Sequence, residues 1–241
     1  MDGRKQGKTN VISETGVSIT VPLVDYLTFP FDHWVVDYVV SRNDAINLAS
    51  YVATHWTQNK NKWVLYNNDC ERRKWANPNP HDIPGGSELF DGLSSKRFID
   101  DLCEITGECQ LFTDPTLHGA GFHIVEPDGY LAPHLDYALH PKIPNMERRV
   151  NLIMFLNGGS REDGGAFELW NDTATEVQGR VYPKPGSAVI WKPGDVEFHG
   201  TQLVKREYPR IAAAMYYLAP ARPNVSRKRA LFIPQRGDPS S

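Results

Sequence analysis

Apolar residues recur at helical spacing in two stretches of the chain. The first, residues 43 to about 57, can be capped by Asn43, and the second, residues 96–105, by Ser94 or Ser95. The two apolar stripes consist of Ala45, Ile46, Leu48, Ala49, Val52 and Ala53, and of Phe98, Ile99, Leu102 and Ile105. Because one face of a helix repeats every three to four residues, both stretches predict helices that pack against a sheet.

From residue 109 onward the pattern changes to short apolar or alternating runs separated by Gly, Pro, Asn and Asp. The predicted strands are 110–113, 121–126, 130–136, 149–156, 166–170, 177–182, 187–191, 197–204 and 210–218, with a further strand at 17–24. Regular short strands with such turns are typical of a sandwich or barrel, and the jelly roll is the natural member of that class. We therefore predict an α+β, mainly β fold: a jelly-roll, cupin-like barrel buttressed by N-terminal helices.

The 241 residues suit one domain with a full core. We expect a flexible N-terminus at 1–15, a single domain at 16–220 and an extended surface tail at 221–241. Residues 66–92 are rich in Asn, Pro and Gly and predict a long loop, either solvated or facing a substrate. The tail contains Arg227-Lys-Arg229, but three basic residues argue weakly for a nucleic-acid contact.

Composition narrows the classes of function. With 40% hydrophobic and 23% charged residues the chain is globular rather than disordered, and a net charge of −3 gives no general argument for nucleic-acid or membrane binding. Cys70, Cys103 and Cys109 form no CxxC pair, and an odd number without a framework favours a reducing compartment. Since the polar N-terminus has no apolar signal stretch behind it, we expect a cytoplasmic protein.

One pair of residues in the predicted strands has the spacing of metal ligands. His134 and Asp136 form a His-x-Asp pair, and alternate side chains of a strand point to the same face. The pair therefore directs an imidazole and a carboxylate at one point, where His199 from a distant strand can supply a third ligand. Two histidines and a carboxylate on one face of an octahedron are typical of non-haem Fe(II) oxygenases. His-x-Asp also arises by chance, and the same ligands suit zinc, so a zinc hydrolase is an alternative.

Arg210 opens another predicted strand. Alternation places Arg210 on one face with Ala212 and Ala214, although a core strand more often carries large branched residues there. This pattern indicates a charged anchor at the bottom of a roomy pocket. A guanidinium is suited to bidentate carboxylate binding, and a zinc hydrolase would leave Arg210 without a role.

Residues 119–218 carry a series of motifs in a fixed order. They are the segments 119–130, 133–136, 148–157, 164–170 and 185–191, followed by His199-Gly200 and Arg210. In this combination the segment resembles the catalytic core of the 2-oxoglutarate and Fe(II)-dependent dioxygenases, nearest to their prolyl 4-hydroxylase-like branch. The residues before this segment show no such resemblance.

The resemblance implies a double-stranded β-helix, the jelly-roll barrel, with iron at its open end. It implies His134, Asp136 and His199 as the iron ligands. Arg210 would bind the C5 carboxylate of 2-oxoglutarate. The implied cofactors are Fe(II), 2-oxoglutarate and O2, with ascorbate as an optional reductant. The retained carboxylate of Asp136 favours hydroxylation, because halogenating relatives replace it with a small residue.

Three further residues are candidate cosubstrate contacts. His123 stands where relatives place a polar residue near the cosubstrate, although a hydrogen-bonded structural histidine is the alternative. Asn151 places an amide on an otherwise apolar inward face and so needs a partner, for which the cosubstrate is a candidate. Tyr130 lies four residues before His134, where relatives usually have a spacing of three, and Phe155 replaces a tyrosine of some relatives.

The sequence leaves the substrate open. A peptidyl prolyl residue is suggested by the resemblance alone, and a free amino acid or small metabolite has equal standing. Trp75, Tyr137, Trp170 and Trp191 can shape a substrate pocket, although buried core is the commoner fate of aromatic residues. A nucleic-acid oxidative demethylase would want a basic groove with stacking aromatics, which the charge balance does not indicate. The remaining alternative is a non-catalytic, cupin-like metal-binding module.

Overall fold

The computed structural model describes residues 16–18 and 24–234. The expected N-terminus at 1–15 and most of the strand expected at 17–24 lie outside the described residues. The helices are α1 (Arg42–Gln58), α2 (Gly86–Leu93) and α3 (Lys96–Thr106), with short 3-10 turns η2 (Lys60–Lys62) and η3 (Pro80–Asp82). The strands are β1 (Val24–Leu27), β2 (His33–Val36), β3 (Val64–Tyr66), β4 (Glu71–Asn77), β5 (Phe112–Thr113), β6 (Gly121–Leu135), β7 (Met146–Phe155), β8 (Phe167–Trp170), β9 (Val177–Val181), β10 (Ala188–Trp191), β11 (His199–Thr201), β12 (Arg210–Pro220) and β13 (Leu231–Phe232).

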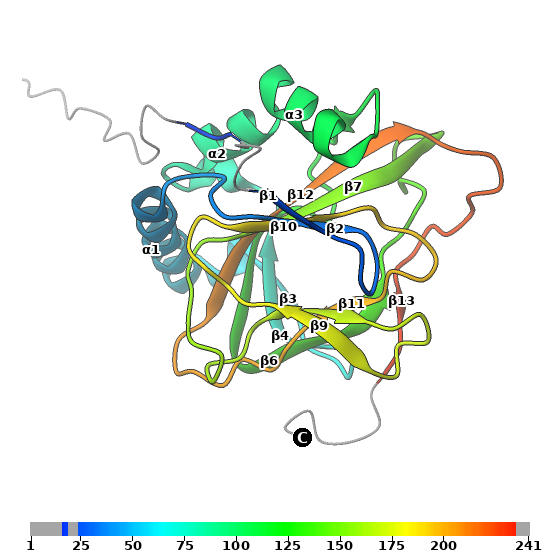
Figure 1. The fold of residues 1–241 in the computed structure, drawn as a ribbon. Helices are drawn as coiled ribbons and strands as arrows, with labels where there is room; N and C mark the ends of the chain where they lie inside the picture. The colour runs from blue at the N-terminus through cyan, green and yellow to red at the C-terminus, as the bar shows by residue number, and fades with distance from the viewer. Residues whose placement is uncertain (1–15, 19–23, 235–241) are drawn as a thin grey trace, which may run out of the picture.

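The described strands form one curled antiparallel sheet in the order β1-β2-β10-β7-β12-β6-β11-β8-β9. The sheet folds back on itself, so that the β2-β10-β7-β12 part faces the β11-β8-β9 part across the barrel interior (Figure 1). Off this path, β3 pairs with β4, β4 and β13 pair with β6, and β5 pairs with β12. This is the predicted mainly β, jelly-roll barrel with buttressing helices; of these, α2 was not predicted, because it lies in the stretch 66–92 that was expected to be a loop.

Strand β6 belongs to both parts of the curled sheet. Its first half pairs with β12, with Ile124 opposite Ile211, and its second half pairs with β11, with His134 opposite His199. The sequence predicted two strands with a turn at Asp128-Gly129, which is wrong, because β6 is continuous through these residues. Asp128 has a φ of 61°, so the interruption is an irregularity inside one long strand.

The helices cover the outer face of the β2-β10-β7-β12 part of the sheet, as predicted (Figure 1). Alternate residues of β7, such as Leu152 and Met154, are fully buried in the same core cluster as Leu48 of α1 and Leu102 of α3. Burying a side chain of this size stabilises the fold by about 1.5–3 kcal/mol. The other residues of the strands face the barrel interior, where the second apolar cluster contains Phe155, Phe167, Leu169, Val189 and Trp191.

The predicted helices are present, with one cap misplaced. Ser95 caps α3 by accepting a hydrogen bond from the backbone N–H of Phe98, and Gly107 ends this helix in the left-handed conformation. Helix α1 is capped by Ser41 rather than by Asn43, because the Ser41 hydroxyl accepts from the N–H of Asp44. No described helix is both long and apolar enough to cross a membrane.

The loop predicted at 66–92 is wrong. This segment contains strand β4, which pairs along both halves of β6, the turn η3 and all but the last residue of α2. The strand was missed because its residues are mostly polar and half-buried, so that they show no apolar alternation. Lys74 and Ala76 line the interior cavity, and a ligand cavity can accommodate a polar side chain such as that of Lys74.

The tail predicted as a surface segment also joins the fold. It is extended, but β13 pairs with the end of β6, placing Leu231 opposite Leu135 and Phe232 opposite His134. The ring of Phe232 lines the interior cavity. The expected domain limits at 16–220 stay a prediction. Residues 231–232, which lie beyond these limits, are paired with a strand of the barrel.

The junction of β4 and β6 depends on a glycine. Gly121 has a φ of +104°, and a Cβ atom there would lie 2.1 Å from the carbonyl oxygen of Asn77. Gly107 also has a positive φ, +68°, but a Cβ atom there would meet nothing within 4 Å. An alanine at Gly107 would therefore introduce backbone strain alone, whereas an alanine at Gly121 would add a steric clash with the backbone.

We expect Gly107→Ala to lower the free energy of unfolding by about 1 kcal/mol, the typical cost of a left-handed residue with a Cβ. Gly121→Ala should lower it by at least about 2 kcal/mol more, because a clash with backbone cannot be relieved by a side-chain rotation. Urea denaturation of the two variants and the parent measures both values. Equal losses at the two positions would contradict the close approach of β4 and β6.

Candidate metal centre and active site

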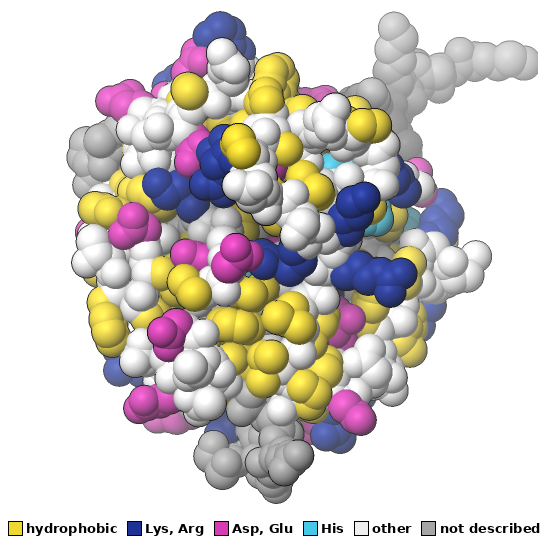
Figure 2. All heavy atoms as spheres, turned by 90° about the vertical axis from the view of Figure 1, so that its right-hand side faces the viewer, with side chains coloured by type: hydrophobic (Ala, Val, Ile, Leu, Met, Phe, Trp, Pro, Cys, Tyr) yellow, Lys and Arg dark blue, Asp and Glu magenta, His cyan; other side chains and the backbone are white. Residues whose placement is uncertain are grey.

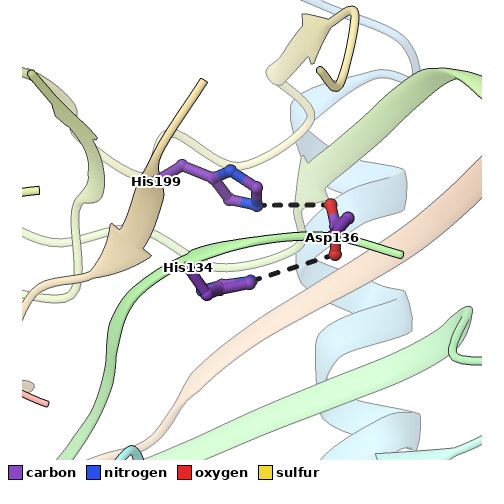
Figure 3. A group of neighbouring side chains, drawn as sticks. All are labelled: His134, Asp136 and His199. Atoms are coloured by element: carbon purple, nitrogen blue, oxygen red, sulfur yellow. Dashed lines mark ion pairs between the residues drawn. The ribbon is translucent and has the colours of Figure 1, made fainter. Parts of the chain in front are cut away.

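Three polar side chains of the cavity wall point toward one another (Figure 3). His134 lies near the end of β6, Asp136 follows this strand by one residue, and His199 begins β11. Antiparallel pairing sets His199 opposite His134, which brings a residue from far along the chain beside the His-x-Asp pair. The structure thus brings together the three residues that the sequence predicted as metal ligands.

The three side chains direct their ligand atoms at one point. Nε2 of His199 lies 3.3 Å from one Asp136 carboxylate oxygen, and Nε2 of His134 lies 3.9 Å from the other. One ligand atom from each residue lies within 4.8 Å of the others, and the three side chains are largely buried. Such a set of two imidazoles and one carboxylate suits a divalent metal with open positions on its other side.

The backbone fixes the tautomer of both imidazoles. Nδ1 of His134 lies 3.0 Å from the carbonyl oxygen of Ala132, and Nδ1 of His199 lies 3.0 Å from that of Glu197. A carbonyl oxygen only accepts, so Nδ1 carries the proton in each ring and Nε2 keeps its lone pair. Both lone pairs face Asp136, as metal binding requires.

The protonation states suit a metal as well. Burial, together with the neighbouring His199, lowers the pKa of His134 to about 3, so this imidazole is neutral near pH 7. Burial opposes ionisation of Asp136, but the positive charge of the nearby Arg148 guanidinium outweighs it and holds the pKa of the carboxyl well below its usual value. The site therefore offers neutral imidazole and an ionised carboxylate.

Two residues orient the Asp136 carboxylate. The Asn151 amide donates to one carboxylate oxygen at 2.6 Å, and Nη1 of Arg148 lies 3.0 Å from the other. The amide oxygen of Asn151 is buried without a hydrogen-bond partner, as are Nε and Nη1 of Arg148. Asn151 thus has a carboxylate contact that the sequence did not predict, and its expected contact with a cosubstrate stays a prediction.

The sequence did not predict the role of Arg148, because plain alternation puts residues 148 and 151 on opposite faces of β7. The register between β7 and β12 shifts at this point, with Leu218 opposite Arg148 but Tyr217 opposite Val150. One extra residue on β7 turns Arg148 to the same interior as Asn151. The guanidinium lies between two tyrosine rings, 3.7 Å from the centroid of Tyr137 and 3.5 Å from that of Tyr216.

Arg210 occupies the same cavity as the triad. Its side chain is buried, and Nε donates to the carbonyl oxygen of Gly165 at 2.9 Å. Among the described residues the guanidinium has no carboxylate partner, and burial together with the nearby Arg206 lowers the pKa of Arg210 to about 9. A buried cation without an anion is costly unless a ligand supplies one, so this position fits a carboxylate group.

The other two candidate cosubstrate contacts differ in position. His123 lines the cavity, and its Nε2 lies 3.1 Å from the carbonyl oxygen of Gly119; burial lowers the pKa of His123 to about 3. Tyr130 does not line the cavity, and its hydroxyl donates to the carbonyl oxygen of Asp69 at 2.9 Å. The structure therefore gives no support to the predicted cosubstrate contact of Tyr130, whose side chain leaves the barrel at the irregularity near Asp128.

The cavity has a volume of about 450 Å³, within the usual range for small-ligand sites. Its wall includes the triad, Arg148 and Arg210 together with Tyr137 and Trp191. Trp75 and Trp170 are not part of the wall. The indole N–H of Trp191 is buried without a partner, and its ring packs edge-on against His199 at 4.7 Å.

The rim beside Tyr137 is held by a buried hydrogen bond between His140 and Asp114. Nε2 of His140 lies 3.0 Å from a carboxylate oxygen of Asp114, while Nδ1 accepts from the backbone N–H groups of Lys142 and Ile143. The other Asp114 contacts include the backbone N–H groups of Thr116 and His118. This pair fixes the two loops that form one side of the cavity mouth.

Comparisons with known proteins agree with this geometry. Residues 120–218 match the model of the 2OG-Fe(II) oxygenase superfamily. No curated protein matches the chain. Among solved structures, a Pseudomonas putida prolyl-4-hydroxylase is 15% identical, with a TM-score of 0.55 over 82% of this chain and 92% of that one.

Two further structures are similar. A viral collagen prolyl hydroxylase from Paramecium bursaria Chlorella virus-1 is 14% identical (TM-score 0.52, 78% of this chain and 96% of that one). A prolyl hydroxylase from Trichoplax adhaerens, in complex with a peptide of hypoxia inducible factor, is 14% identical (TM-score 0.54, 77% and 82%). These likenesses establish the double-stranded β-helix fold. Residues 120–218, which match the model of the 2OG-Fe(II) oxygenase superfamily, carry the triad and Arg210, and the cofactors of that superfamily are Fe(II), 2-oxoglutarate and O2.

Proposed function

We propose that the protein is a hydroxylase in which His134, Asp136 and His199 hold Fe(II) and Arg210 binds the C5 carboxylate of 2-oxoglutarate. The observation that carries the proposal is one cavity containing both parts: three converging metal-ligand atoms and a buried guanidinium that has no acidic partner among the described residues. A zinc hydrolase would use the triad but would leave the buried charge of Arg210 without an anion.

The bound iron and 2-oxoglutarate would supply the oxidising power: O2 inserts one oxygen atom into a substrate C–H bond and the other into the cosubstrate, which leaves as succinate and CO2. The chain supplies position and exclusion of water. Arg210 holds one end of the cosubstrate by a charge-assisted pair, which is strong because the guanidinium is buried. Asn151 and Arg148 orient the Asp136 carboxylate.

Two buried polar atoms without partners, the indole N–H of Trp191 and the amide oxygen of Asn151, come from residues that face each other across β7 and β10. Buried polar groups are rarely left unpaired. The Trp191 N–H can donate to an oxygen of the cosubstrate, whereas the Asn151 oxygen only accepts and would need an ordered water beside the cosubstrate. Because Asp136 retains its carboxylate, the site has no space for a halide ligand at that position, which favours hydroxylation.

The substrate is proposed as a peptidyl prolyl residue, a free amino acid or another small metabolite. The first class is suggested by the similar structures, two of which are prolyl hydroxylases of bacterial and viral origin. Nucleic acid is the weaker alternative: on the face in Figure 2, Lys and Arg side chains alternate with Asp and Glu and adjoin hydrophobic side chains, so no continuous basic groove crosses it. The cytoplasm is proposed as the location from the sequence alone.

Removal of a triad residue should abolish metal binding. We expect Asp136→Ala and His199→Ala to weaken Co(II) binding by more than about 100-fold, beyond the 10–100-fold typical of outer-shell changes. Isothermal titration of the metal-free protein with Co(II) measures the affinity. His81→Ala, at an exposed histidine on η3, is the matched control and should bind as the parent does. Parent-like affinity of both triad variants would contradict the metal site.

Removal of Arg210 should separate cosubstrate binding from metal binding. We expect Arg210→Ala to weaken 2-oxoglutarate binding by about 100-fold, the usual scale for truncating one partner of a buried charged pair, while Co(II) affinity stays within a few-fold of the parent. Titration of the Co(II)-loaded protein with 2-oxoglutarate measures this, and succinate release measures turnover. Arg161→Ala, at an exposed arginine, serves as control. Unchanged 2-oxoglutarate affinity in Arg210→Ala would refute the assignment.

A further inference from the structure

The charges on the cavity wall do not balance. Lys74 and Glu71 form an ion pair at 2.9 Å and neutralise each other. Asp136 is the proposed metal ligand and Arg210 the proposed cosubstrate anchor. Two cations of the wall remain, Arg148 and Lys142, and no further carboxylate of the chain lines this cavity among the described residues.

Arg148 is a preorganised donor. Its residue is 2% exposed, and the guanidinium is held between two tyrosine rings. Nε and Nη1 have no hydrogen-bond partner, although Nη1 lies 3.0 Å from Asp136. A carboxylate bound to a metal shares its charge with that metal, so Asp136 compensates Arg148 less well once the site is loaded. A substrate anion beside Arg148 would restore the balance.

Lys142 lies at the rim on the same side of the cavity. Its side chain is exposed and has no ion-pair partner among the described residues. The backbone N–H of Lys142 donates to His140 at 3.2 Å, and His140 is itself fixed by Asp114. The ammonium group therefore extends from an anchored loop beside His118, which also lines the cavity.

We propose that the site selects a small substrate with a free carboxylate, which Arg148 and Lys142 receive while the carbon to be hydroxylated faces the triad. The proposal rests on the proposed function and chooses between its substrate classes. A free amino acid or similar small acid carries the required anion, whereas a prolyl residue inside a peptide carries an amide in its place. A charge-assisted contact is also directional, and it would fix one end of a small flexible molecule.

The test compares acids with their amides in the absence of turnover. A panel of L-amino acids and small hydroxy acids, each paired with its carboxamide, is titrated calorimetrically into protein loaded with Co(II) and 2-oxoglutarate. We expect at least one acid to bind and its amide to bind about tenfold or more weakly, since hydrogen bonds to charged groups are stronger than neutral ones. Lys142→Glu should weaken the binding of that acid by a similar factor. Lys205→Glu, at an exposed lysine outside the cavity, is the control and should leave the binding unchanged.

Each outcome decides the matter. If no acid binds, if acids and amides bind equally, or if Lys142→Glu leaves the affinity unchanged, the carboxylate proposal is overturned. Succinate release with a prolyl peptide but with no acid would favour the peptide class and keep the proposed function. Failure of the parent protein to bind Co(II) or 2-oxoglutarate at all would instead remove the proposed function.

A second inference comes from the chain after β12, independently of the substrate. We call residues 222–233 the C-terminal strap, which runs down the right-hand side of Figure 1. Arg222 anchors its start, with its backbone N–H 2.9 Å and its Nε 3.0 Å from the carboxylate of Glu147. The strap ends as β13, paired with β6.

Arg227 of the strap holds the backbone of an expected metal ligand. Its Nε donates to the carbonyl oxygen of Asp136 at 2.7 Å, and Nη2 donates to that of Gly194 at 2.6 Å. In return, the carbonyl oxygen of Arg227 accepts from the N–H groups of Ala138 and Leu139 at 2.8 and 2.9 Å. Asp136 lies beyond the end of β6, so these bonds replace the strand pairing that its backbone lacks.

Phe232 covers the ring of another expected ligand. Its ring stacks on the imidazole of His134 with centroids 4.7 Å apart and an interplanar angle of 22°. The ring of His199 contacts the same imidazole, with a centroid distance of 4.4 Å. Phe232 also forms part of the cavity wall. The orientation of His134 therefore depends on the strap as well as on its own hydrogen bond to Ala132.

We infer that Arg227 and Phe232 are positioning residues of the metal centre, and that the strap completes a site whose proposed ligands all lie between residues 134 and 199. Loss of a contact that orients a metal ligand typically lowers metal affinity by about 10–100-fold. The strap acts on two of the three ligands, one through its backbone and one through its ring.

The test measures metal affinity and ligand geometry in full-length variants. We expect Arg227→Ala and Phe232→Ala to weaken Co(II) binding by about tenfold or more and to alter the visible spectrum of the Co(II) protein. Phe232→Tyr, which keeps the flat ring, should restore both. Lys228→Ala, an exposed strap residue, is the control. Thermal unfolding of each metal-free variant shows whether the fold is intact.

The inference fails if folded Arg227→Ala and Phe232→Ala proteins keep parent Co(II) affinity and spectrum. Should Phe232→Ala not fold, Phe232→Leu takes its place, because leucine retains apolar bulk without the ring, and parent-like binding of that variant overturns the role of stacking. Loss of binding that Phe232→Tyr does not restore would likewise count against an oriented ring.

Discussion

Strand β6 is the constraint on which the site depends, because it belongs to both parts of the curled sheet. Its first half places Val125 opposite Arg210, and its second half places His134 opposite His199. The strand changes partner near Asp128, where the backbone adopts a positive φ. Since one element carries both pairings, the separation of the triad from the buried guanidinium is set by strand geometry, and it cannot change without loss of hydrogen bonds on both sides.

The barrel interior then has to accommodate charges that water would otherwise solvate. Asp136 stays ionised because Arg148 lies beside it, and Arg148 stays buried because two tyrosine rings face its guanidinium. Arg210 lacks such compensation within the described chain, although Gly165 offers it a carbonyl oxygen. This asymmetry distinguishes the two arginines: among the described residues Arg148 has an acidic neighbour, whereas Arg210 has none. Both guanidinium groups are buried, so the difference between them lies in their neighbours.

The barrel, its helices and the meeting of His134, Asp136 and His199 could be predicted from the sequence, because alternation and turn residues are local signals and His-x-Asp needs no tertiary information beyond one strand. Arg148 could not, since the register shift that turns it inward is a property of two paired strands. Strand β4 was missed for a related reason. A strand such as β4, whose residues are half-buried and polar, lacks the apolar period on which a prediction rests.

The contacts of the strap could not be predicted because they depend on where residues 222–233 lie in the folded protein. Proline and basic residues predict an exposed tail, and most of its side chains are indeed exposed. Asp136, however, lies one residue beyond β6, where pairing no longer fixes the backbone. The backbone at such a position needs support from another segment, and Arg227 provides it by donating a hydrogen bond to the Asp136 carbonyl oxygen. The motif therefore defines which atoms can bind a metal, whereas the contacts that hold those atoms still come from a segment that no local pattern connects to it.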